Sequence, residues 1–272
     1  MRSLLANKVA VGCLALIGLF CVAGVFAPWL APHAPNQIDV INSLASPSWE
    51  YPFGTDHLGR CLLSRMLFGI RITLFYSMLT MAVTALCGAA IGVISGYVRG
   101  KLDELIMRVC DVMLSFPYEI MVLCIVGILG PGLMNIVIAN FIAKLAWYVK
   151  MIRSSVISFS SKNYILYSQT IGTSRRYIFF RHLFPNVASE TILLATLDIG
   201  WIIITISTLS FLGLGVQLPT AEWGAMLSEA REVLMTNPGQ MIIPGLAIMI
   251  VVAAFNLLGD SLRDILDPKE SQ

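Results

Sequence analysis

Charged side chains are scarce in this chain of 272 residues. Asp, Glu, Lys and Arg make up 12% of it, the hydrophobic types make up 57%, and the mean hydropathy is +0.80. Soluble domains carry about twice that charged fraction. The few charges are also segregated, so that long runs contain none. These two features exclude a soluble globular protein and predict an all-α integral membrane protein of a single domain, residues 1–272.

An ATP-binding motif is also lacking. The nearest candidate ends at Gly100-Lys101, but Ser95 stands where a P-loop needs its first glycine. Leu102 then follows the lysine in place of Ser or Thr. No Ser/His/Asp set and no zinc motif is found either. We therefore expect this chain to have no catalytic site and to bind no cofactor of its own.

Metal ligands are few. The three histidines, His33, His57 and His182, lie outside the apolar runs, and the thirteen methionines are scattered. The six cysteines show no paired spacing of the kind found in zinc sites or disulfide frameworks. We therefore expect no metal site in the chain. The net charge of +2 gives no reason to expect a nucleic-acid partner.

Apolar runs predict about six transmembrane helices. They cover Val9–Pro32, Ile72–Val98, Val109–Gly130, Leu133–Val149, Thr191–Leu212 and Met241–Leu258. Pro117 predicts a kink in the third run, and the many Gly and Ala residues of the second predict close helix packing. The first run exceeds the roughly 7–15 apolar residues of a signal peptide, so we favour an extra N-terminal span within 1–32 over a signal cleaved near Ala27.

Basic residues predict the orientation of these spans. Arg2 and Lys8 precede the first span, and most of the other Lys and Arg residues fall on the same side of the predicted topology. Because cytoplasmic loops are enriched in Lys and Arg, we expect both termini in the cytoplasm.

Residues 28–70 are predicted to form an external loop followed by an interfacial helix. Pro28–Pro52 is rich in Pro, Asn and Ser, which favours a loop. Thr55 or Asp56 could then cap a helix that lies along the membrane surface. Arg60 and Arg65 would reach from that helix toward water by snorkelling.

The stretch from Lys162 to Asn186 is basic, contains no acid, and yet is rich in Tyr, Phe, Ile and Leu. Its basic residues predict a cytoplasmic position. Tyr164–Ile171 can form a short helix, Gly172 allows a turn, and a second segment would end at Pro185. We interpret residues 160–186 as a loop that docks a cytoplasmic partner, although an interfacial loop without any partner would have the same composition.

Several motifs resemble the permeases of ATP-binding-cassette (ABC) importers. The Gly172 to Pro185 spacing resembles their cytoplasmic coupling loop, although Leu166-Tyr167-Ser168 replaces the usual Glu-Ala-Ala triplet, and His182 and Phe184 replace Ile and Leu. The signature Gly54-Thr55-Asp56-x-x-Gly59-Arg60 resembles the dipeptide, oligopeptide and nickel branch, with Cys61 in place of the usual Asp. The last third, including Phe211–Val216, Pro219–Gly224 and Ala254–Pro268, is similar to the second permease of nickel importers.

This resemblance implies a type I ABC importer permease bundle with core residues 70–265, in the bacterial cytoplasmic (inner) membrane. Such a permease pairs with a homologous second permease, two cytoplasmic ATPase subunits that use ATP and Mg, and an extracytoplasmic solute-binding protein. The residues that would couple the chain to the ATPases are Tyr164, Leu166, Tyr167, Gly172, Arg175, Arg176 and Pro185. The solute would be nickel or another metal, carried as a chelate or as a weakly held ion, or else a short peptide.

Three charged residues within the spans are candidates for the translocation path: Glu119, Lys144 and Asp198. An ionised group at the bilayer centre costs about 2.5–3.5 kcal/mol, so these residues should face one another or a wet cavity. A purely structural pair between Lys144 and one acid explains them equally well. Two other classes of protein stay open at this point: a self-contained secondary transporter with Asp198 and Glu119 as ion sites, and a structural membrane anchor.

Overall fold

The computed structural model describes residues 7–266, with the side chains of Gln169, Arg175 and Leu266 left out of the description. Within that range, five helical runs are long and apolar enough to cross a membrane. These are α2 (Lys8–Val25); the run Leu62–Val98, formed by α4 (Leu62–Ile70), η2 (Arg71–Phe75) and α5 (Tyr76–Val98); α8 (Leu133–Ser160); the run Arg176–Phe211, which contains α11 (Phe184–Phe211); and α13 (Gly239–Leu266).

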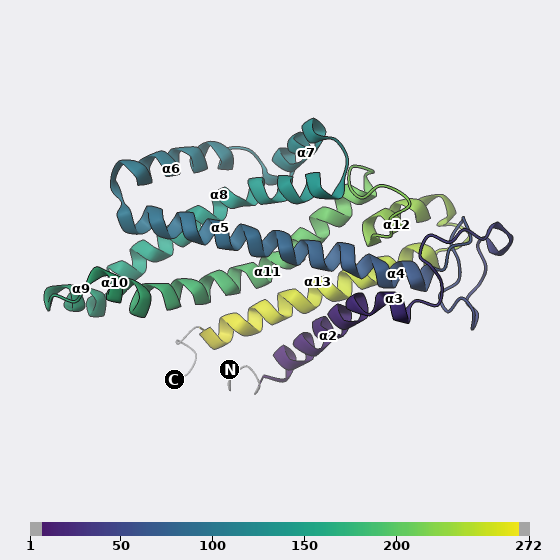
Figure 1. Cartoon of the computed structure of the whole chain (residues 1–272), viewed down its shortest axis with the longest axis horizontal. Coiled ribbons are helices and arrows are strands. Elements are labelled where there is room, and N and C mark those ends of the chain that lie inside the picture. The colour runs from purple at the N-terminus through teal and green to yellow at the C-terminus, as the bar shows by residue number, and fades with distance from the viewer. Residues whose placement is uncertain (1–6, 267–272) are drawn as a thin grey trace.

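A sixth crossing results if α6 (Gly100–Leu114) and α7 (Tyr118–Leu129) count as one bent span. The prediction of an all-α membrane protein with about six transmembrane helices is therefore confirmed. The remaining elements lie at the two ends of the bundle (Figure 1). At one end are α9 (Asn163–Thr170), α10 (Arg175–Ile178) and η3 (Phe179–Leu183); at the other are α3 (Ala27–Leu30), η1 (Val40–Asn42), α12 (Trp223–Glu229) and η4 (Ala230–Val233).

Small residues bring α5 and α8 into close contact, as the sequence predicts. A Cβ atom on Gly88 would lie 2.5 Å from Cβ of Tyr148, and one on Gly92 would lie 2.8 Å from the carbonyl oxygen of Val149. Side chains at these positions would force the two helices apart. The seam fixes α8, and with it Lys144 and Tyr148, against the centre of the bundle.

The N-terminal part of the long run Leu62–Val98 is a correction to the prediction. Instead of a separate interfacial helix that begins at Thr55 or Asp56, the helix begins at Leu62 and continues through η2 into α5. The preceding residues form a tight loop, because Oδ1 of Asp56 accepts the backbone N–H groups of Leu58 and Arg60 at 2.9 Å each. An aspartate that makes these bonds organises a turn rather than a helix start.

The third predicted span is also different. Pro117 does not mark a kink within one helix, because α6 and α7 are separate helices that meet at 88°. Pro117 has no N–H to donate, and its backbone is extended, with ψ at 136°. The chain therefore leaves helical geometry completely before α7 begins.

The fourth and fifth spans extend further than predicted. The fourth continues past Val149 to Ser160, and the fifth begins at Arg176 rather than Thr191. Pro185 does not end the second segment of the loop. It lies in the first turn of α11, directly after the π-helical turn η3, and the helical run continues through it.

Candidate coupling segment and transmembrane charges

The segment Lys162–Asn186 folds into a helical elbow, which we call the coupling segment. Its first helix, α9, ends in a left-handed turn at Gly172, where φ is +82°. The N–H of Thr173 donates to the carbonyl oxygen of Ser168 at 3.1 Å, which is the closing bond of a Schellman motif. The predicted helix, turn and second segment are therefore all present, and Gly172 is the residue about which the chain reverses.

A small apolar core holds the two arms of the coupling segment together. Ile165 from α9 and Ile178 and Leu183 from the second arm are buried against one another, with Phe159 and Phe179 beside them. A cluster that joins both arms lets the elbow move as one body rather than as two loose helices.

The outer face of the coupling segment is apolar but exposed. Tyr164, Leu166 and Tyr167 all project from α9, with the side chain of Tyr167 68% exposed. The His182 ring lies between the rings of Tyr164 and Tyr177, at centroid distances of 5.7 and 5.9 Å. Arg176 is exposed at the start of the second arm. This face presents aromatic and aliphatic groups with a basic residue beside them.

The predicted coupling residues are contiguous in the structure as well as in the sequence. Tyr164, Leu166 and Tyr167 lie on α9, Gly172 forms the turn, and Arg175 and Arg176 begin α10. Pro185 follows in the first turn of α11, at the base of the second arm.

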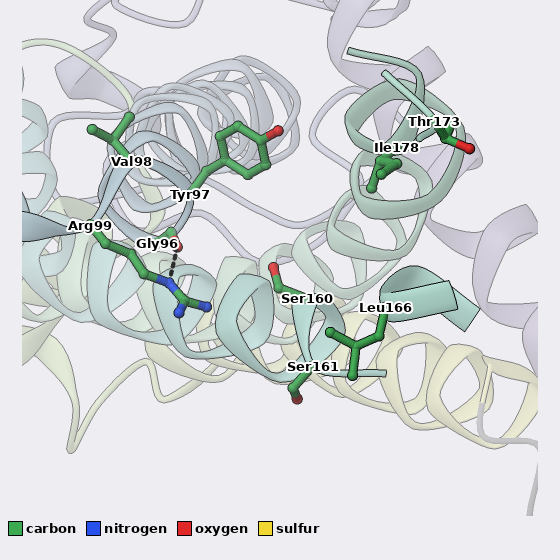
Figure 2. Close-up of a pocket in the computed structure, with 9 residues that line it drawn as sticks. All are labelled: Gly96, Tyr97, Val98, Arg99, Ser160, Ser161, Leu166, Thr173 and Ile178. Atoms are coloured by element: carbon green, nitrogen blue, oxygen red, sulfur yellow. Dashed lines mark hydrogen bonds between the residues drawn. The ribbon is translucent and has the colours of Figure 1, made fainter. Parts of the chain in front are cut away.

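A cavity of about 700 Å³ lies between the coupling segment and the end of α5 (Figure 2). Leu166, Thr173 and Ile178 line it from the coupling segment. The opposite walls are formed by Gly96, Tyr97, Val98, Arg99, Ser160 and Ser161. The rings of Tyr97 on α5 and Phe179 on the second arm lie 5.7 Å apart, so the elbow contacts α5 there and faces the cavity next to that contact.

Lys144 and Asp198 form an ion pair between α8 and α11. Nζ of Lys144 lies 2.9 Å from Oδ1 of Asp198, and the hydroxyl of Tyr148 donates to Oδ2 at 2.8 Å. The two charged side chains are 15% and 19% exposed. The Lys144 ammonium also lies 5.3 Å from the ring centroid of Trp147. The pairing that the sequence left open is thus formed between Lys144 and Asp198.

Glu119 does not join this pair. It lies in the first turn of α7, is exposed, and lines a cavity of about 220 Å³ between α7 and α11. Trp201 and Thr205 of α11 line the same cavity. The structure therefore places the three predicted path residues in two locations, a closed pair and an open acidic group.

A buried charge cluster at the other end of the bundle was not predicted. Nη2 of Arg60 lies 2.6 Å from Oε1 of Glu229, and Nη2 of Arg65 lies 2.7 Å from Oε2 of the same carboxylate. Nε of Arg60 is 2.6 Å from Oδ2 of Asp56. Both arginine side chains are almost completely buried, so the prediction that they snorkel toward water is wrong. Their guanidinium groups are neutralised by two carboxylates instead.

Gly59 explains why the signature around Asp56 contains glycine. Its φ is +75°, and a Cβ atom there would lie 1.7 Å from the carbonyl oxygen of Asp39. Only glycine fits this position. The signature therefore shapes the loop that delivers Arg60 and Arg65 to the cluster. Glu229 stands 169 residues after Arg60, and no local spacing links the two.

Comparison with known proteins places this architecture in a family. Residues 88–272 match the family described as "Binding-protein-dependent transport system inner membrane component", and residues 1–47 match the "N-terminal TM domain of oligopeptide transport permease C". The first match covers more than half of the chain. The chain belongs to this family of binding-protein-dependent permeases.

Curated relatives span nearly the whole permease. It is 42% identical over 255 residues to the nickel transport system permease protein NikC of Escherichia coli K12, which covers 94% of this chain and 92% of the relative. It is 40% identical over 271 residues to the metal-staphylopine import system permease protein CntC of Staphylococcus aureus NCTC 8325, covering 100% and 94%. Identity to the dipeptide transport system permease protein DppC of Alkalihalophilus pseudofirmus is 38% over 268 residues, covering 98% and 88%. The chain is thus a permease subunit of an ABC importer and a multi-pass inner-membrane protein.

The permease contains another buried acid, Glu222, that the sequence did not single out as a site. Glu222 caps α12 and is fully buried, and its carboxylate accepts hydrogen bonds from Thr73 at 3.0 Å, Ser207 at 3.3 Å and the N–H of Ala225 at 2.8 Å. Burial raises the pKa of the Glu222 carboxyl above its ordinary value. Glu222 ties α12 to the two long helices, and its only sequence signal was its place in the Pro219–Gly224 motif.

Proposed function

We propose that this permease carries nickel or another metal, bound in a chelate, into the cell. It would form half of the translocation path, with a homologous second permease as the other half. An extracytoplasmic solute-binding protein would deliver the chelate, and two cytoplasmic ATPase subunits would use ATP and Mg to drive the cycle. We choose this solute because the chain is similar to a nickel permease and to a metal-staphylopine permease over more than nine-tenths of its length.

The coupling segment would dock on one ATPase subunit, with both chain termini in the cytoplasm. Its exposed Tyr164, Leu166 and Tyr167 supply an apolar contact surface, and Arg176 adds charge beside it. Its two arms share the core of Ile165, Ile178 and Leu183, so a push on α9 would be transmitted to α11. Because α11 also carries Asp198, this route joins the docking surface to the ion pair inside the bundle.

The charged residues of the bundle would suit a chelate with groups of both signs. Lys144 and Asp198 neutralise each other, so together they offer a bare divalent cation little net attraction. A chelate brings its own carboxylates to the metal and so presents negative groups to Lys144. Glu119, which lines the separate cavity between α7 and α11, would contact a cationic group of the chelate.

Short peptides are the second candidate solute. The 38% identity to a dipeptide permease over 98% of the chain favours them, and a zwitterionic peptide would also use one acid and one lysine.

Uptake by the complete importer distinguishes the two. Cells lacking other nickel importers would express this permease with its second permease, ATPases and binding protein, and would take up radioactive nickel with a chelator present. We expect saturable uptake that requires every subunit and that a hundredfold excess of mixed dipeptides does not inhibit. Inhibition by dipeptides, with dipeptide uptake by the same cells, would show that the permease carries peptides instead.

A further inference from the structure

α6 presents a regular apolar stripe to the outside of the bundle. All of its members are exposed, and they recur at alternating intervals of three and four residues: Leu102, Leu105, Val109, Val112 and, just past the end of the helix, Phe116. This is the heptad spacing of a helix that packs lengthwise on another helix. The opposite face of α6 is already in use, because Cys110 is buried there against α8.

α6 runs alongside a membrane span. Asp103 accepts both Nε and Nη2 of Arg153 from α8, the second at 2.6 Å, and Asp111 pairs with Lys150 of α8 at 2.7 Å. Figure 1 shows α6 beside α8 at the edge of the bundle. α8 is a candidate membrane span, and α6 together with α7 counts as a possible sixth crossing beside it.

Lipid is a poor cover for this face. Glu104 and Arg108 flank the stripe as an ion pair at 3.8 Å, with side chains 70% and 75% exposed. Asp111 and Lys150 are also about half exposed. Ionised side chains in hydrocarbon cost about 2.5–3.5 kcal/mol each, whereas water would leave the apolar stripe unburied. An apolar seam flanked by ion pairs is instead the pattern of a helix that meets another protein helix.

The same side of the permease leads to the translocation path. α7 follows α6 after the break at Pro117, and its first turn carries Glu119 beside Trp201 of α11. A protein that covers α6 therefore lies next to the open acid of the path. In an importer whose translocation path lies between two permeases, the protein that covers α6 would be the second permease.

We propose that the α6 stripe packs against a transmembrane helix of the second permease and closes the path along its side. This inference rests on the proposed function, because it takes the second permease as the other half of the path. It adds the helix and the residues through which the two permeases meet.

Photo-crosslinking in the complete importer tests this contact. p-Benzoylphenylalanine would replace Leu105 or Val112 in the stripe, and Val22 on α2 as an equally exposed apolar control. After irradiation of membranes we expect a covalent adduct of this chain with the second permease from positions 105 and 112, and no such adduct from position 22. Adducts with lipid alone, with a second copy of this chain or with an ATPase would overturn the proposal.

A matched pair of substitutions gives an independent readout. Val109→Arg places a charge in the stripe, whereas Val22→Arg makes the same change at an equally exposed valine of α2. We expect Val109→Arg to lower the amount of the second permease that co-purifies with this chain by about tenfold, and Val22→Arg to leave that amount within about twofold. If both variants co-purify the same amount of the second permease, at equal amounts of this chain in the membrane, the proposal is contradicted. Solute uptake by the unsubstituted importer, measured in parallel, reports separately on the proposed function.

Discussion

The Lys144 ammonium and the Asp198 carboxylate neutralise each other across 2.9 Å between α8 and α11. Neither charge is fully buried, and Tyr148 holds the second carboxylate oxygen. A pair in this position both supports the bundle and stands ready to meet a charged solute. A set of substitutions separates the two roles.

Asp198→Asn is expected to lower the melting temperature of the purified permease. It leaves the Lys144 ammonium without its counter-charge, which costs up to about 3 kcal/mol for a largely buried pair. The double variant Lys144→Met with Asp198→Asn removes both charges and should recover most of the loss. If the double variant is as stable as the parent but transports nothing, the pair acts in the path. Full transport by the double variant would reduce the pair to a structural role.

Gly172→Val is expected to uncouple ATP hydrolysis from uptake. The left-handed backbone at this turn costs a β-branched residue about 1–2 kcal/mol, while no atom lies within 4 Å of the added Cβ. The substitution should therefore change the backbone of the turn in the coupling segment without disturbing side-chain packing around it. Gly172→Asn, which tolerates the left-handed conformation, is the control and should keep normal coupling. The measurement is the number of ATP molecules hydrolysed per solute imported; a normal ratio in Gly172→Val removes the turn from the mechanism.

Glu229→Gln is expected to destabilise the permease by about 3–5 kcal/mol. The change leaves the buried guanidinium groups of Arg60 and Arg65 with Asp56 as their single carboxylate. Glu232→Gln is a matched control on η4, the short helix that follows Glu229, because Glu232 is exposed. Thermal unfolding of the two variants in the same detergent measures the difference. Equal melting temperatures would show that the cluster contributes little.

Glu222 predicts a dependence of stability on pH. Because the folded-state pKa of this carboxyl is raised, the folded permease holds the proton more tightly than the unfolded chain does. Its contribution to stability is therefore complete below the ordinary glutamate pKa of about 4.5 and is lost as the pH rises through the raised value. Replacement by Gln keeps the hydrogen bonds, since the hydroxyls of Thr73 and Ser207 can reverse their direction.

We accordingly expect the melting temperature of the parent protein to fall more steeply with rising pH than that of Glu222→Gln. Parallel curves between pH 4.5 and 8 would mean that Glu222 does not titrate in this range.

The sequence predicts best where the signal is local. The apolar runs give the spans, and the composition of residues 162–186 gives the helix, the turn at Gly172 and the second arm. Pro117 marks a break, but its 88° angle depends on how α6 and α7 each pack on α8, which lies later in the chain.

Long-range partners are where the prediction fails. From the sequence, Arg60 and Arg65 are interpreted as surface residues of an interfacial helix. Their partner Glu229 is far away in the sequence and is brought to them only by the fold. The same limit applies to Lys144, for which the sequence offers two acids and no means of choosing between them. Glu119, the acid left over, keeps its proposed place in the path.

The orientation of the coupling segment tests the central claim most directly. Tyr167→Cys would be introduced after replacement of the native cysteines, and membranes would be treated with a maleimide that cannot cross the bilayer. We expect labelling in inside-out vesicles stripped of the ATPase subunits, and protection when those subunits are added back. Labelling from the outside of intact cells, or labelling that the ATPases leave unchanged, would contradict the account of this segment as the docking site.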